Sequence, residues 1–199
     1  MRARGFTLLE LMITISIIAG LTSLAIPNMI RARMAANEVA TIAMVKNFGT
    51  SQELYRRTDW DGNGVREYAQ NIGPNGGNGN LESLYFNVLN NVTTGLMDAA
   101  VANAEIPASG NMSIVTPRDG YAFYVQLGTS YPNTLSYVNS SNQMTNGYAV
   151  CAVPYQYGLS GISTFQMDSS GVVYSKDQGS NTLVAAYNTN PANLWVGVQ

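Results

Sequence analysis

Histidine is absent from the 199-residue sequence, and cysteine occurs once, as Cys151. Without histidine the chain cannot build a Ser-His-Asp triad or most zinc sites, and one cysteine cannot close an internal disulfide. Charge is also scarce, since 11% of residues are charged against about 25% in an ordinary soluble domain. The 10 basic and 12 acidic residues give a net charge of −2, which excludes a protein that tracks nucleic-acid phosphates. These absences predict a protein that is not an enzyme and does not bind nucleic acid.

The longest apolar run covers residues 6–26 and contains one charged residue, Glu10. About 20 apolar residues in a helix span the hydrocarbon core of a bilayer, so this run is long enough to cross a membrane. The leader that precedes it, residues 1–5, carries two arginines. Basic flanks favour the cytoplasmic side, so we expect the leader inside the cell and the bulk of the chain outside. Arg31 and Arg33, beyond the other end, weaken this preference.

Helical periodicity continues past the apolar run and predicts one helix over residues 6–57, loosened at Gly20 and Pro27. Beyond Pro27, six residues recur at spacings of three, four and seven positions, which places them on one face of the helix. They are Ile30, Met34, Thr41, Val45, Phe48 and Tyr55. A plain membrane anchor followed by an amphipathic stalk would explain this pattern.

Glu10 does not suit a plain anchor, because a carboxylate near the centre of a membrane span costs roughly 2–3 kcal/mol or more. It lies one helical turn after Phe6, on the same face of the helix. If the chain is cut between Gly5 and Phe6, the new ammonium group of one chain becomes a partner for Glu10 of a neighbouring chain. Such a pair would set the stagger of packed helices.

The segment from Gly5 to Met12, GFTLLELM, follows a short basic leader and resembles the class III signal of type IV pilins and type II secretion pseudopilins. Pro27 also lies where this family commonly carries a helix-loosening proline. The resemblance implies cleavage after Gly5 by a prepilin peptidase, N-methylation of Phe6, and assembly of copies into a helical filament by inner-membrane machinery. It places the precursor in the bacterial inner membrane, with a single pass, and the assembled subunit in an extracellular or periplasmic filament.

A possible calcium loop follows the predicted helix. Its candidate ligands are the side chains of Asp59, Asp61 and Asn63, the carbonyl of Val65, and Glu67. Alternate oxygens of this kind converge on a cation in an EF-hand, and the glycine after Asn63 permits the sharp turn. The twelfth position holds glutamine where an EF-hand has a bidentate glutamate, so the loop is incomplete. The alternative interpretation is an Asp/Asn/Gly-rich turn that ends the helix.

Residues 58–199 are expected to form a globular head. Residues 81–105 predict helix in two pieces, and five later segments predict short strands because they are rich in β-branched and aromatic residues between turn signals. These segments are 113–116, 121–127, 148–153, 163–167 and 172–175, with residues 194–196 as an edge strand or a docked tail. Antiparallel strands against a long helix predict an α+β fold. The expected organisation is a cleaved leader (1–5), an N-terminal helix (6–57) and the head.

Three functions are compatible with this organisation. We favour a structural subunit of a type IV pilus-like filament, because the head is larger than in the main secretion pseudopilin and the candidate calcium loop directly follows the helix. A type II secretion pseudopilin is the first alternative. A membrane-tethered, calcium-dependent adhesin that uses the helix only as an anchor is the second.

Overall fold

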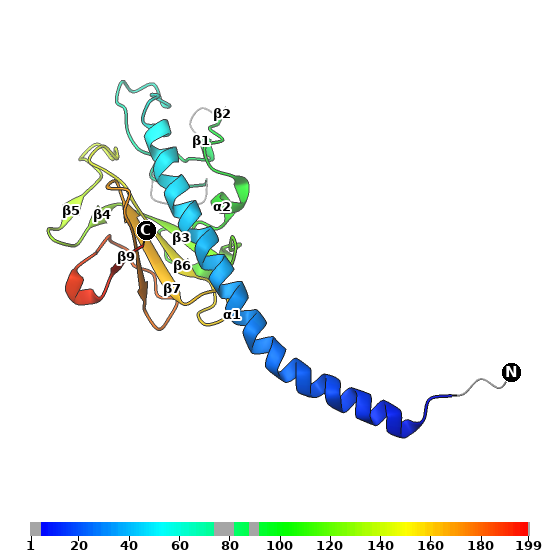
Figure 1. Cartoon of the computed structure of the whole chain (residues 1–199). Coiled ribbons are helices and arrows are strands. Elements are labelled where there is room, and N and C mark those ends of the chain that lie inside the picture. Colours follow the sequence, from blue (N-terminus) through cyan, green and yellow to red (C-terminus); the bar gives the residue numbers. More distant parts are fainter. Residues whose placement is uncertain (1–4, 74–81, 88–91, 199) are drawn as a thin grey trace.

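A computed structural model describes residues 5–73, 82–87 and 92–198, and its longest element is helix α1, Leu8–Tyr55. The helix is capped by Thr7 and runs without interruption through Pro27. Figure 1 shows its first half projecting away from the head and curving as it leaves the head. The predicted helix is therefore confirmed and is two residues shorter at each end.

The head is built on one five-stranded antiparallel sheet with the order β3-β6-β7-β8-β9. The strands are β3 (Tyr121–Gln126), β6 (Ala149–Pro154), β7 (Ser163–Asp168), β8 (Val173–Asp177) and β9 (Val196–Val198). Four of the five predicted strands, at 121–127, 148–153, 163–167 and 172–175, are confirmed within two residues. The edge strand β9 lies two residues beyond the predicted segment 194–196. The predicted α+β fold, a long helix on a small antiparallel sheet, is confirmed.

The remaining elements are short. They are β1 (Phe86–Asn87), β2 (Val92–Thr93), α2 (Ala99–Asn103), the 3-10 turn η1 (Met112–Ile114), β4 (Gly128–Thr129), β5 (Leu135–Ser136) and the 3-10 turn η2 (Pro191–Asn193). The prediction of two helical pieces over residues 81–105 is wrong for the described part, where only α2 is helical. Residues 81 and 88–91 of that prediction lie outside the described residues. The predicted strand at 113–116 is also wrong, because η1 occupies its start.

The second half of α1 packs on β6, β7 and β8. Thr41, Val45, Phe48 and Tyr55 are buried as their spacing predicts, while the earlier members of that face are half-buried. Phe48 meets the ring of Tyr148 edge-on, with 5.9 Å between ring centroids. The apolar face of the stalk is therefore part of the core of the head.

Polar contacts fix α1 to the head along the same half. The Asn37 side-chain amide donates to the Ser160 carbonyl (2.8 Å), and Glu38 Oε1 accepts the two backbone N–H groups where β7 begins (2.9 and 3.0 Å). Farther along, Gln52 Nε2 donates to the Ala69 carbonyl (2.7 Å), and Gln52 Oε1 accepts the Ala69 N–H (2.9 Å). The helix is therefore held from Asn37 to its C-terminal end, and the preceding half has no such contacts among the described residues.

Candidate functional site

The free half of α1, residues 8–29, is exposed throughout and apolar on every side apart from Glu10. Among the described residues, α1 alone is long and apolar enough to cross a membrane, and none of the residues in its apolar stretch is buried. A helix that is apolar all round must be buried in lipid or protein to be stable. This half is the first candidate functional surface.

Hydroxyl side chains in the free half satisfy their own hydrogen bonds. Thr14, Ser16, Thr22 and Ser23 each donate to a backbone carbonyl three or four residues earlier, at 2.8 to 3.0 Å. Such bonds let hydroxyl groups sit in apolar surroundings without an unpaired donor. The free half is therefore suited to lipid or to packing against other helices, with Glu10 as its one ionisable group.

Glu10 forms a capping box with Thr7 at the start of α1. Glu10 Oε2 accepts the Thr7 N–H (2.9 Å) and the Thr7 hydroxyl (2.8 Å), and the Glu10 N–H donates to Thr7 Oγ1 (3.2 Å). Sequence reasoning missed this role of Thr7, although Thr-x-x-Glu before an apolar run is its usual signal. Glu10 therefore lies in the first turn of the helix, beside the exposed segment of Gly5 and Phe6. The rest of the predicted leader, residues 1–4, lies outside the described residues.

Pro27 lies inside α1 and leaves the helix continuous. Proline has no backbone N–H, so the carbonyl of Ser23 loses its partner four residues along. The missing bond lets the helix bend between its free half and its packed half, which agrees with the curvature in Figure 1.

The loop after α1 is organised by Asp59. Its carboxylate accepts the backbone N–H groups of Gly62 (2.8 Å), Asn63 (3.2 Å) and Gly64 (2.8 Å). The two glycines have φ of +74° and +84°, the left-handed conformation that glycine tolerates best. Hydrogen bonding to these N–H groups, that of Gly64 above all, lowers the pKa of Asp59. Asp59 therefore holds the loop in shape.

Asn63 bridges two other predicted ligands. Its side-chain N–H₂ donates to Asp61 Oδ2 (2.5 Å) and to Glu67 Oε1 (3.1 Å), and its Oδ1 accepts the Val65 N–H (2.7 Å). The loop thus brings Asp61 and Glu67 together. Glu82, which sequence reasoning missed, joins them, and one carboxylate oxygen from each of the three lies within 4.8 Å of the others. No local motif signals Glu82, because the fold alone brings it near Glu67.

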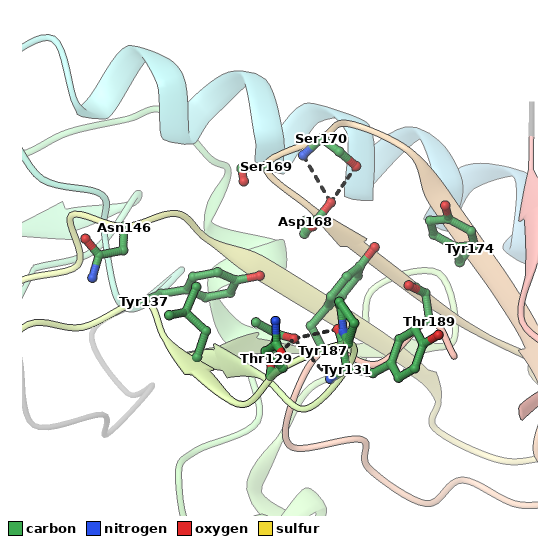
Figure 2. Close-up of a pocket in the computed structure, with 13 residues that line it drawn as sticks. Thr129, Tyr131, Tyr137, Asn146, Asp168, Ser169, Ser170, Tyr174, Tyr187 and Thr189 are labelled. Carbon is green, nitrogen blue, oxygen red and sulfur yellow. Dashed lines mark hydrogen bonds between the residues drawn. The ribbon is translucent and has the colours of Figure 1, made fainter. Parts of the chain in front are cut away.

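A pocket of about 490 Å³ lies beside the end of β7 and is rich in tyrosine (Figure 2). Tyr131, Tyr137, Tyr174 and Tyr187 line it, and none of the thirteen lining residues is cationic. Its one carboxylate, Asp168, accepts the N–H (3.0 Å) and the hydroxyl (2.5 Å) of Ser170. Hydroxyl groups, aromatic faces and one carboxylate suit a neutral polar or cationic ligand better than an anion.

Comparisons with known proteins give two family matches. The model of the family described as Protein of unknown function (DUF2950) matches residues 22–198. The model of the prokaryotic N-terminal methylation motif matches residues 1–26.

A curated relative supports the second match. The type IV wide pilus major component PilA4 of Thermus thermophilus is 44% identical over 54 residues, which are 27% of this chain and 41% of that protein. The match therefore spans less than half the length of that relative. No solved structure matches the chain. The methylation motif and this relative confirm that the N-terminus carries a class III signal of the type found in type IV pilins and pseudopilins.

Proposed function

This chain belongs to the family described as Protein of unknown function (DUF2950), and we propose that it is a structural, pilin-like subunit, and not an enzyme, that polymerises into a type IV pilus-like filament. One observation carries the proposal. A class III signal directly precedes an exposed half-helix that is apolar apart from Glu10 and continues without a break into a packed α+β head. Figure 1 displays this division between the projecting helix and the head.

The apolar half-helix needs cover in every state of the protein. Burying one leucine or isoleucine side chain contributes about 1.5–3 kcal/mol, so an uncovered helix would aggregate. The large exposed side chains of this half-helix, together with Phe6 just before it, are Phe6, Leu8, Leu9, Leu11, Met12, Ile13, Ile15, Ile17, Ile18, Leu21, Leu24, Ile26 and Met29. The bacterial inner membrane covers them in the precursor, with the head outside. Helices of neighbouring subunits cover them in the filament, which is extracellular or periplasmic.

Processing makes the pairing partner for Glu10. A prepilin peptidase cuts between Gly5 and Phe6, and the new Phe6 amine is N-methylated. Within the subunit, Glu10 caps α1 through Thr7. Within the filament, its charge pairs with the Phe6 ammonium of an adjoining subunit, and the assembly machinery of the inner membrane brings the two together. Low dielectric strengthens this pair and makes an orphaned charge costly.

Three variants separate the two roles of Glu10, which are capping α1 and supplying a negative charge for pairing between subunits. Glu10→Gln keeps a side chain that can complete the capping box but removes the charge, whereas Thr7→Ala removes the cap and keeps the charge. We expect Glu10→Gln and Glu10→Ala to reduce filament yield at least about tenfold, because removing one partner of a buried ion pair costs about 3–5 kcal/mol. Thr7→Ala should still assemble, since capping contributes only about 1 kcal/mol.

The measurement is the yield of sheared filaments relative to the protein in the membrane fraction, with the N-terminal mass of each variant. Filaments of Glu10→Gln at normal yield would refute the pairing between subunits. Assembled protein that still carries residues 1–5 would refute the processing step.

The pseudopilin alternative differs in where the polymer acts. A pseudopilin polymer stays in the periplasm and its loss blocks protein secretion, whereas loss of a pilus subunit removes surface filaments. Deletion of the gene, scored for both phenotypes, separates the two functions. The tethered-adhesin alternative predicts that Glu10 variants behave like the unaltered chain.

A further inference from the structure

Three carboxylates from two segments of the chain converge beside the C-terminal end of α1. Asp61 and Glu67 belong to the loop after the helix, and Glu82 begins the next described segment. One oxygen of each lies within 4.8 Å of the other two. Glu67 and Glu82 are buried, with 4% and 1% of their surface exposed, and Asp61 is half-buried. This cluster, Asp61, Glu67 and Glu82, is called the acidic triad below.

A second observation concerns the polar atoms that face the acidic triad. The Tyr55 hydroxyl and Glu67 Oε2 are buried without a hydrogen-bond partner among the described residues. Tyr55 is 1% exposed, and its pKa is raised by burial first and then by the negative charges of Glu82, Glu67 and Asp61. The tyrosine thus buries its hydroxyl next to the three carboxylates. A buried oxygen without a hydrogen-bond partner destabilises the folded state unless a bound ion, water or ligand interacts with it.

Among the residues that the structure describes, two members of the acidic triad also lack a compensating charge. In the described part of the chain, no Lys or Arg nitrogen lies within 4 Å of Asp61 or Glu67. Burial, and then repulsion from Asp61 and Asp59, raises the pKa of Glu67, although Asn63 opposes this by donating to it. Asp61 and the buried Glu67 thus place two like charges side by side in a poorly solvated site. Binding of a cation or of protons neutralises this charge and relieves the repulsion.

We propose that Asp61, Glu67 and Glu82 bind one calcium ion, which ties the loop after α1 to the segment that starts at Glu82. Carboxylate oxygens are the hard ligands that calcium prefers, at 2.3–2.6 Å, as a general rule. Oxygens on opposite sides of such an ion are about 5 Å apart, so one ion can reach all three members of the triad. Glu67 Oε2 supplies a lone pair that no described residue uses.

This ligand set differs from a consecutive EF-hand loop. Asp59 is occupied by three backbone N–H groups, and Asn63 directs its amide donors at Asp61 and Glu67. Gln70 holds the place of the last EF-hand carboxylate, and Glu82 supplies that carboxylate from another part of the fold. The ion therefore links two segments of the chain as a calcium clamp, whereas an EF-hand ion is bound by a single loop.

Thermal unfolding of the full chain in detergent micelles tests the clamp, with calcium or with a chelator. Calcium at about 100 times its Kd should raise the Tm of the unaltered chain by roughly 5–10 °C, because it binds only the folded state. Glu82→Gln should lose most of this rise. Glu53→Gln is the matched control, since Glu53 is an exposed carboxylate of α1 outside the triad, and it should respond like the unaltered chain.

Terbium gives a direct binding readout. Tyr55 stacks on Trp60, with 5.7 Å between ring centroids. A terbium ion bound by the triad therefore lies near two aromatic rings that can transfer excitation energy to it. Excitation of these rings should produce terbium emission that calcium displaces, and Trp60→Phe should weaken the emission without changing the calcium-dependent rise in Tm. If Glu82→Gln does not fold, Asp61→Asn, at a half-exposed position, replaces it in both assays.

Either of two results would overturn the calcium clamp. One is an equal Tm of the unaltered chain in calcium and in chelator, which would mean that protons neutralise the triad. The other is an equal response of Glu82→Gln and Glu53→Gln to calcium, which would mean that the ion binds elsewhere. Both assays use unassembled protein, so their failure leaves the proposed assembly through α1 untouched.

Discussion

Gln52 holds the packed half of α1 to the head through a pair of hydrogen bonds that water cannot replace. The side chain is fully buried, and so is its partner, the backbone of Ala69. Its amide donates to the Ala69 carbonyl and accepts the Ala69 N–H, at 2.7 and 2.9 Å. Replacement by methionine keeps the length and most of the volume of the side chain but removes both bonds.

The expected loss follows from the two backbone groups that Gln52→Met leaves without a partner. Each buried group of this kind costs about 1–3 kcal/mol, so the free energy of unfolding should fall by about 2–6 kcal/mol. For a chain of this size, 1 kcal/mol corresponds to roughly 2–4 °C in Tm, so a loss of about 3 kcal/mol lowers the Tm by roughly 6–12 °C.

Thermal unfolding of the full chain in detergent, followed by circular dichroism, measures the effect. Thr50→Ala is the control on the exposed face of the same helix, where the hydroxyl donates only to the Lys46 carbonyl at 3.4 Å. Its effect should stay within about 0.5 kcal/mol. A Tm of Gln52→Met equal to that of Thr50→Ala would refute the reasoning that this pair stabilises the joint.

Two further predictions concern buried ionisable groups. Burial raises the pKa of Glu105 to about 8 from its ordinary 4.5, against the opposing hydrogen bonds from Gly73 and Ile72. The folded state therefore binds the Glu105 proton more tightly than the unfolded state does. The stabilisation from protonated Glu105 is fully present below about pH 4.5 and is lost as the pH rises through about 8. Glu105→Gln should flatten this dependence in denaturant titrations, and an unchanged slope would contradict the assignment. Cys151 is fully buried and its pKa is raised to about 12 by burial, so maleimide should label it at neutral pH only after unfolding in denaturant; rapid labelling of the folded chain would disprove this.

Periodicity made the large elements predictable. The face of α1 that contains Val45, Phe48 and Tyr55 repeats with the helical period, and those residues are buried. The central strands β6 and β7 are bounded by clear turns, and the Asp168–Gly171 turn joins β7 to β8 as a hairpin. Where one period persists over many residues, local sequence and tertiary packing favour the same structure.

Short elements were mispredicted because local contacts decide them. Ser113 to Thr116 has the composition of a strand, but the Asn111 side chain accepts the Ser113 N–H (3.0 Å) and starts η1. Ile114 then stays exposed, and Val115 enters the core only after η1 has ended. Asp98 likewise caps only a five-residue helix, α2. Capping by Asn and Asp competes with the strand or long helix that composition alone favours.

The acidic triad was predictable only in part. The spacing of Asp61 and Glu67 indicated a cation loop, because both lie in one turn-rich segment. Glu82 is separated from Glu67 by 14 intervening residues along the chain, and its position depends on how the next segment returns to the end of α1. Convergence of this kind is a property of tertiary structure, which a local motif does not record.

The unbroken course of α1 has a mechanical consequence. Its 48 residues make a rod about 72 Å long, at about 1.5 Å per residue, with no linker between the apolar half and the sheet. Tension on the apolar half is delivered directly to β6, β7 and β8, and it loads the contacts of Asn37, Glu38 and Gln52 together in shear. Pro27 lies outside that joint, so bending is absorbed there before the head is pulled open.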